Sequence, residues 1–143
     1  MTNSNAKVPF ASPQWVEIAR GVLERLVAEH GEIGTNYSIC EAFAQAPVAI
    51  ADANGFAAWH FSVEGKSVNV HVGRDENADV QIQATWETSL EGARTVYTPE
   101  YLAEREKNPP PPPDDPNLKV SGDMTAIPGY LIELHNDMAV LTE

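Results

Sequence analysis

Residues 56–72 read FAAWHFSVEGKSVNVHV, and the order of apolar and polar side chains in this stretch decides the fold class. Apolar side chains alternate with small or polar ones on both sides of Gly65-Lys66. The stretch therefore predicts two antiparallel strands, 56–63 and 67–72, joined by a two-residue turn with glycine at its first central position. One face of this hairpin is apolar and has to be covered by other elements.

A helix from Pro13 to His30 is predicted before the hairpin. Ser12 is a suitable N-cap, Pro13 suits the first helical position, and Gly31 is a suitable residue to end the helix. Apolar residues recur three or four positions apart, so one stripe of the helix packs inward. We interpret Gly21, inside this helix, as a site where the backbone approaches a sheet.

Two further strands are predicted at 36–43 and 79–84, because apolar residues alternate there as well. We expect the second to follow the hairpin as a third antiparallel strand. His60 would then lie opposite His71, and Asp79 beside His71, in one row on the face away from the apolar side chains. Such a row suits a metal ion or an acid–base group, whereas the interpretation that we favour is a solvated polar face.

Helical spacing of apolar residues predicts helices at 85–94 and 99–107. A last strand is predicted at 118–120, and a final helix capped by Asp123 or Thr125 follows it. Pro128 is compatible with that helix because it falls in the first turn.

These elements predict a single α+β domain over residues 12–143, in which a mostly antiparallel sheet has helices covering one face. Residues 1–11 are rich in Asn and Ser, and we expect them to be a frayed or disordered end. That end has one Lys and no apolar segment typical of a secretory signal, so the sequence predicts a cytoplasmic protein.

Charge restricts the classes of partner. The chain has 9 Lys and Arg against 21 Asp and Glu, a net charge of −12, and residues 1–31 are balanced, so the excess lies in 32–143. No basic cluster is present, which argues against nucleic acids and anionic membrane surfaces, and no apolar run is long enough to insert in a membrane. Cys40 is the only cysteine, which excludes an internal disulfide and a multi-cysteine zinc site.

Three stretches of the chain carry a resemblance to a known family. They are the hairpin 59–72 with its turn glycine, the segment NADVQI at 77–82 and the segment LKVSGDM at 118–124. In this order, over roughly residues 35–142, they are similar to the sterol carrier protein 2-like lipid-binding domains. The resemblance implies an α+β fold that holds a small apolar ligand between sheet and helices, with no shared catalytic residue and no cofactor or metal.

The chain departs from that family in an insert at about 97–117. The insert contains a Tyr-rich helix and five prolines, 109–113, which predict a polyproline II segment roughly 16 Å long at about 3.1 Å per residue. Two alternatives stay open for it: a lid over the mouth of the cavity, or an exposed loop on a stiff spacer.

By position, eleven side chains are candidates for contact with an apolar ligand, and the alternative for each is ordinary core packing. Tyrosine hydroxyls among them suit a ligand with one polar end. The candidates are Trp59, Phe61, Trp86, Leu90, Tyr97, Tyr101, Met124, Ile127, Tyr130, Leu131 and Leu134.

The sequence therefore favours a carrier or binding protein for a small hydrophobic molecule. The rival is a small cavity enzyme, an isomerase, lyase or hydrolase with a Glu or His base and Tyr donors. Glu41 shares a strand face with Tyr37, Ile39 and Phe43, so it is a candidate base with a raised pKa, unless a shifted register exposes it. A homodimer is compatible with the sequence. The catalytic candidates are Glu41, His60 and His71.

Overall fold

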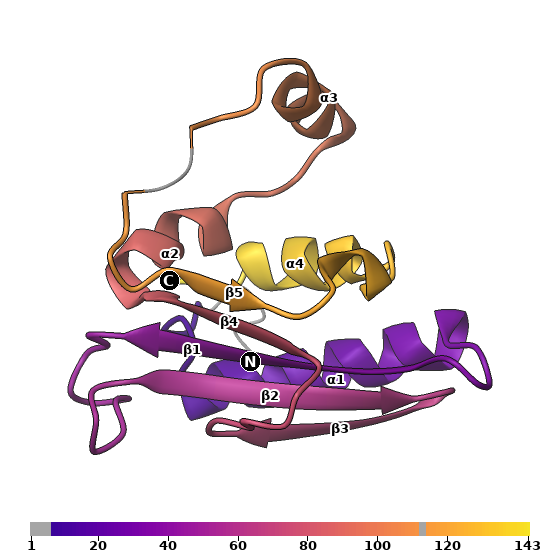
Figure 1. Ribbon diagram of the computed structural model, residues 1–143, viewed down its shortest axis with the longest axis horizontal. Coiled ribbons are helices and arrows are strands. Elements are labelled where there is room, and N and C mark those ends of the chain that lie inside the picture. The colour runs from indigo at the N-terminus through magenta and orange to yellow at the C-terminus, as the bar shows by residue number, and fades with distance from the viewer. Residues whose placement is uncertain (1–6, 112–113) are drawn as a thin grey trace, which may run out of the picture.

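The computed structural model describes residues 7–111 and 114–143. Within them a five-stranded sheet has the strand order β3-β2-β1-β4-β5, and every neighbouring pair is antiparallel except the parallel pair of β1 and β4 (Figure 1). The fold is α+β with a mostly antiparallel sheet, as predicted. The strands are β1 (Asn36–Ala44), β2 (Ala57–Glu64), β3 (Ser67–Val72), β4 (Val80–Thr85) and β5 (Lys119–Ser121).

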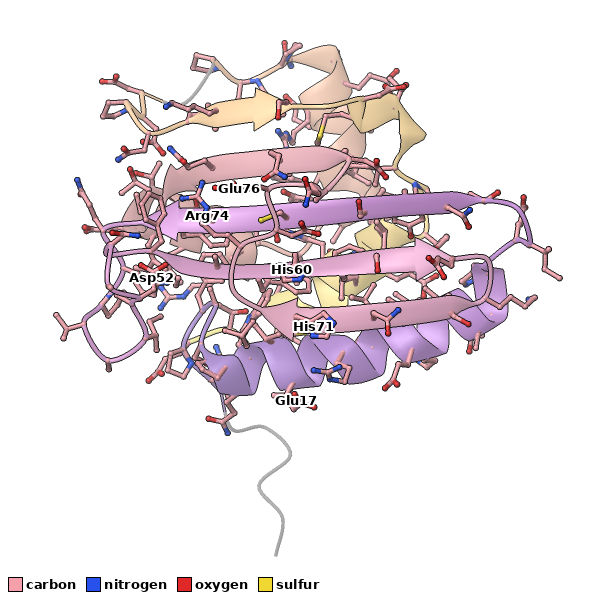
Figure 2. The ribbon with its side chains drawn as sticks, turned by 60° about the horizontal axis from the view of Figure 1, so that its bottom comes forward. Glu17, Asp52, His60, His71, Arg74 and Glu76 are labelled. Carbon is pink, nitrogen blue, oxygen red and sulfur yellow. The ribbon has the colours of Figure 1, made fainter. Side chains whose placement is uncertain are left out.

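Three helices cover one face of this sheet, and Figure 2 shows the sheet with its other, outer face forward. Helix α1 packs on β3 and on α4, and α2 packs on β4, β1 and α4. A fourth helix, α3, lies apart from the sheet and from the other helices (Figure 1). The helices are α1 (Pro13–His30), α2 (Trp86–Arg94), α3 (Pro99–Lys107) and α4 (Leu131–Ala139), with a 3-10 turn at Met124–Ala126.

The predicted hairpin is confirmed in its register. Val63 pairs with Val68, Phe61 with Val70, and His60 with His71. Gly65 in the turn has φ +61°, a conformation that glycine adopts at little cost.

The prediction that residues 79–84 continue this meander is wrong. Strand β4 pairs in parallel with β1, with Ile39 opposite Val80, so β3 is an edge strand. Strand β1 is buried along most of its length and needs a neighbour on each side, whereas β3 is mostly exposed and needs only one. The Asp79 carboxylate accepts a hydrogen bond from the Ser38 backbone N–H (3.0 Å), which ties it to β1 and not to His71.

The connection from β3 to β4 therefore crosses the outer face of the sheet. Figure 2 shows Arg74 and Glu76 on this connection, in front of the strands. The Asp75 backbone N–H lies 3.4 Å from the Cys40 thiol of β1, and Cys40 is buried as a small apolar residue. The crossing thus covers the outer side of β1.

The N-terminal segment is also different from the prediction. Residues 1–6 lie outside the described residues, but Val8, Phe10 and Ala11 are buried in the core. The Val8 backbone N–H donates to the Leu141 carbonyl (2.8 Å), and the Glu143 N–H donates to the Val8 carbonyl (2.9 Å). Three apolar side chains in five residues have enough surface to offset the cost of ordering this short segment.

Helix α1 has the predicted bounds, and the Ser12 hydroxyl accepts a hydrogen bond from the Trp15 N–H (3.1 Å) at its start. Gly21 does not approach the sheet, because a Cβ at that position would have no neighbouring atom within 4 Å. The close approach occurs at Gly31, where a Cβ would meet the carbonyl oxygen of Gly65. The helix end, and not its middle, therefore requires glycine.

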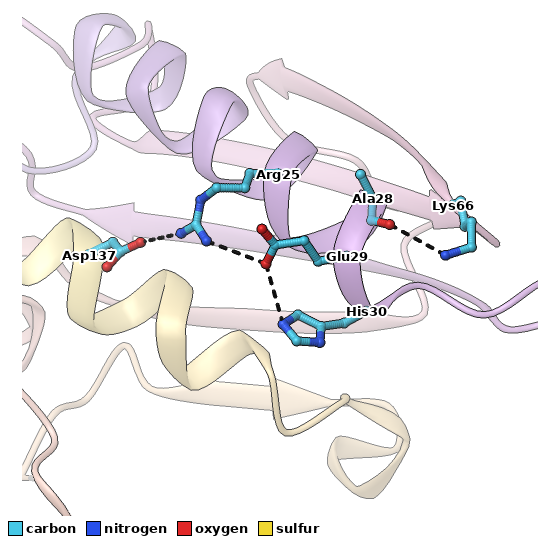
Figure 3. Close-up of polar contacts among 6 residues, drawn as sticks. All are labelled: Arg25, Ala28, Glu29, His30, Lys66 and Asp137. Atoms are coloured by element: carbon cyan, nitrogen blue, oxygen red, sulfur yellow. Dashed lines mark hydrogen bonds and ion pairs between the residues drawn. The ribbon is translucent and has the colours of Figure 1, made fainter.

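Ion pairs at the C-terminal end of α1 connect it to α4 (Figure 3). The Arg25 guanidinium lies 2.7 Å from the Asp137 carboxylate of α4 and 3.6 Å from Glu29 of its own helix. The side chains of Arg25 and Asp137 are about half exposed, so this contact adds at most about 1 kcal/mol.

The last helix begins later than predicted. Asp123 does act as a cap, but it caps the 3-10 turn, and α4 starts only at Leu131. Pro128 lies in the connection between the 3-10 turn and α4 and not in the first turn of a helix, and its carbonyl accepts a hydrogen bond from the Leu131 backbone N–H (3.2 Å).

Replacing Phe10 with Ala should destabilise the protein by about 3 kcal/mol or more, because its ring is 4% exposed and packs against Trp15, Phe43 and Trp86. Urea unfolding measures the change. Val48→Ala, at a side chain that is 95% exposed, is the matched control and should stay within about 0.5 kcal/mol of wild type. Equal effects of the two substitutions would mean that the N-terminal segment is not docked.

Candidate functional site

A pocket of about 470 Å³ lies between the covered face of the sheet and helices α2 and α4. Its inner wall consists of side chains from three adjacent strands and from the N-terminal part of the chain, most of them apolar or aromatic. These are Phe10 and Trp15, Ile39, Glu41 and Phe43 of β1, Trp59 and Phe61 of β2, and Ile82 and Ala84 of β4.

The outer wall comes from α2, α4 and the two ends of the insert. Small residues of α2, Gly92 and Ala93 among them, leave room beside the sheet. Tyr97 lies where the insert begins, and Asp115 and Leu118 lie where it ends. The remaining lining residues are Thr88, Ser89, Ile127, Leu131, Leu134, His135 and Met138.

Six of the eleven candidate ligand contacts line this pocket. They are Trp59, Phe61, Tyr97, Ile127, Leu131 and Leu134. The structure brings these six side chains to one pocket, and their role in binding stays a prediction.

The other five candidates lie elsewhere. Trp86 and Leu90 pack against the core, and the Trp86 indole N–H donates to the Phe10 carbonyl (2.9 Å). Met124 is exposed, and the Tyr130 hydroxyl shares a hydrogen bond with that of Tyr37 (2.7 Å) outside the pocket. Tyr101 stacks on Tyr97 at 5.3 Å between ring centroids and does not line the pocket.

Sequence reasoning missed Phe10 and Trp15 as lining residues. Trp15 belongs to the inward stripe of α1, a signal that could have placed it at the pocket, since its ring contacts that of Trp59 at 5.3 Å between centroids. No local signal identifies Phe10, because its position depends on the bridge between Val8 and Thr142 at the other end of the chain.

Glu41 is the polar group in the inner wall, on the strand face that the alternation of β1 predicts for it. The Trp59 indole N–H donates to its Oε1 at 2.8 Å. Burial raises the pKa of Glu41 above its ordinary value of 4.5, and the hydrogen bond from Trp59 opposes this in part. The Glu41 carboxyl group can therefore exchange a proton, or accept a hydrogen bond, within apolar surroundings.

A second polar region lies in the outer wall. The His135 ring stacks on Tyr97 at 3.9 Å between centroids, and its Nε2 lies 2.7 Å from the Thr95 carbonyl. Burial lowers the pKa of His135, so this ring is neutral at pH 7. The Asp115 carboxylate accepts hydrogen bonds from the backbone N–H and hydroxyl of Thr85, which lower its pKa and keep it ionised.

The histidines of the hairpin do not belong to the pocket. His60 and His71 lie side by side on the outer face, 5.3 Å between ring centroids, and His60 Nδ1 is 2.8 Å from the Gly73 carbonyl (Figure 2). Within residues 7–111 and 114–143, no three His, Cys, Asp or Glu side chains are grouped closely enough to hold a metal ion. The predicted row of His60, His71 and Asp79 does not form.

The described residues of the insert do not close the pocket. The two ends of the insert line the pocket, but none of the described residues between Tyr97 and Asp115 does so. Residues 112–113 of the predicted polyproline segment lie outside the described residues. No helix in the described part of the chain has the length and hydropathy needed to cross a membrane.

The chain has a sterol carrier protein 2-like fold, which it shares with two solved structures. A conserved hypothetical protein of Thermus thermophilus, described as a candidate sterol carrier protein, has a TM-score of 0.51 and 13% identity, with 95% of this chain and 96% of the other covered. A sterol carrier protein 2 has a TM-score of 0.52 and 14% identity, with coverage of 94% and 99%.

At these identities the likeness is one of fold. No family model and no curated protein sequence matches the chain. The expected resemblance is thus confirmed at the level of the fold.

Replacing Glu41 with Gln should make the protein increasingly more stable than wild type as the pH rises. A carboxyl whose pKa is raised on folding stabilises the protein below its ordinary pKa of 4.5, and this contribution is lost as the pH rises through the folded-state pKa. Because Gln does not titrate, the difference in unfolding free energy between variant and wild type should grow with pH and then level off. Urea unfolding between about pH 4 and pH 8 measures it.

Glu100→Gln, at an exposed position of α3, controls for the loss of one negative charge. A difference between Glu41→Gln and wild type that does not change with pH would show that Glu41 is solvated in the folded protein.

Proposed function

We propose that the protein binds a small apolar molecule in the pocket, as a carrier or binding module. The observation that carries this proposal is the pocket itself, about 470 Å³ with mostly apolar and aromatic walls. Ligand pockets commonly have volumes of about 300–1,000 Å³ and such a lining. A well-packed domain of this size would otherwise leave few voids larger than a water molecule.

The two similar structures are named for sterol carrier proteins, which supports a lipid-like ligand. The net charge of −12 supports a ligand without phosphates and argues against nucleic acid. A cytoplasmic location and a homodimer stay predictions.

One observation favours a second function. Glu41 places a carboxyl with a raised pKa in the apolar wall, which is the environment of a general base in a cavity enzyme. Mass spectrometry of the bound molecule distinguishes the two functions. A binding module returns its ligand unchanged after incubation, whereas an enzyme converts it, and Glu41→Gln would slow that conversion by about 100-fold or more.

Filling the pocket should weaken binding without unfolding the domain. Ala93→Phe puts a ring into the lining of α2, and we expect it to weaken binding of an alkyl or steroidal probe by about tenfold or more, since each displaced methylene is worth about 0.8 kcal/mol. Quenching of tryptophan emission reports binding, because Trp15 and Trp59 line the pocket.

Ala103→Phe makes the same change at an exposed position of α3 and serves as the control. If neither alkyl chains nor sterols change the emission of the wild-type protein, or if both variants bind as well as wild type, this pocket is not a binding site.

A further inference from the structure

Charge is distributed unevenly among the residues that line the pocket. Two carboxyl groups, Glu41 and Asp115, belong to the lining, and no Lys or Arg does so among the described residues. His135 also lines it, but its lowered pKa keeps it neutral, and Tyr97 is the remaining titratable side chain. The pocket therefore offers no positive group to an anionic head group.

Glu41 has capacity to accept a further hydrogen bond. A carboxylate has two oxygens with several acceptor positions, and Trp59 is the single donor to Glu41 among the described side chains, at Oε1. The other oxygen, Oε2, has no such donor, and no polar side-chain atom in the described residues is both fully buried and unpaired. Oε2 is therefore not fully buried and has access to the space of the pocket. A ligand that donates to this oxygen would complete the site.

The surroundings of Glu41 increase the effect of such a contact. Ile39, Phe43 and Trp59 line the pocket beside it, and a charge-assisted hydrogen bond is stronger once an apolar ligand displaces water from such surroundings. A cation would compensate the carboxylate, whereas a second carboxylate would repel it. The raised pKa of Glu41 is consistent with this, because the hydrogen bond from Trp59 offsets the effect of burial on the carboxylate only in part.

We propose that the ligand is an apolar molecule with a protonated amine head group, and that Glu41 is the residue that selects it. This inference rests on the proposed function, because it specifies the ligand of the same pocket. Asp115, ionised in the outer wall, adds a second negative group to the lining. A fatty acid of the same length would meet both carboxylates and no cation.

Dodecylamine and dodecanoate below their micelle concentrations, and dodecanol below its solubility limit, separate the head group from the alkyl chain. At about pH 8 an alkylammonium stays protonated, as a lysine side chain does. We expect wild type to bind the amine roughly tenfold to a hundredfold more tightly than dodecanoate, with dodecanol between them, by tryptophan quenching and calorimetry. About 0.5 M salt suppresses attraction of the amine to the acidic surface.

Glu41→Gln should remove most of the preference for the amine and leave dodecanol affinity within a few-fold, since the Gln amide oxygen can still accept from Trp59. Glu100→Gln removes one exposed negative charge and should keep the preference. Circular dichroism checks that both variants fold, and the ranking of the three probes on wild type does not depend on either variant.

The outcomes distinguish the two proposals. Dodecanoate or dodecanol binding as tightly as the amine, or a preference for the amine that survives Glu41→Gln, overturns the selection by Glu41 and leaves a binding pocket in place. If none of the three probes nor a sterol binds to wild type, the proposed function fails and this inference fails with it.

Discussion

Ile39 of β1 pairs in parallel with Val80 of β4, so the chain between β3 and β4 has to cross the outer face of the sheet. This pairing puts β1 in the centre, with β2 on one side and β4 on the other. A central strand is buried on both faces, and the two covers have different origins here. The crossing connection protects the outer face through contacts such as that of Asp75 with Cys40, while the helices protect the inner face.

The helices cover the inner face incompletely, and the pocket is the part that they leave open. Helix α1 packs over β3, and α2 packs over β4 and β1, while α4 and the ends of the insert complete the outer wall of the pocket. Leu134 and Met138 of α4 are buried, but Gly92 and Ala93 of α2 are too small to reach the facing strand residues. The volume of the pocket thus follows from small residues on α2 opposite large ones on the sheet.

Features that depend on neighbouring residues could be predicted from the sequence, and features that depend on distant ones could not. The register of His60 with His71 follows from one short turn, and the cap at Ser12 from three residues. The position of β4 depends on which strand needs a second neighbour, a property of the whole sheet. Phe10 is buried because the segment containing Val8 bonds to the far end of the chain, and no pattern near residue 10 indicates that contact. The face on which Glu41 lies follows from strand alternation, which is local, but its partner Trp59 comes from the adjacent strand.

At position 41 the fold requires a hydrogen-bond acceptor, and this requirement alone does not call for glutamate. Trp59 is almost fully buried, and its indole N–H needs an acceptor, which Glu41 supplies. A glutamine would supply the same acceptor without the cost of burying an ionisable group, a cost visible in the raised pKa of Glu41. What glutamate adds over glutamine is a charge or an exchangeable proton in an apolar pocket. Neither contributes to packing, so the packing and stability of the fold do not account for a carboxyl group at this position.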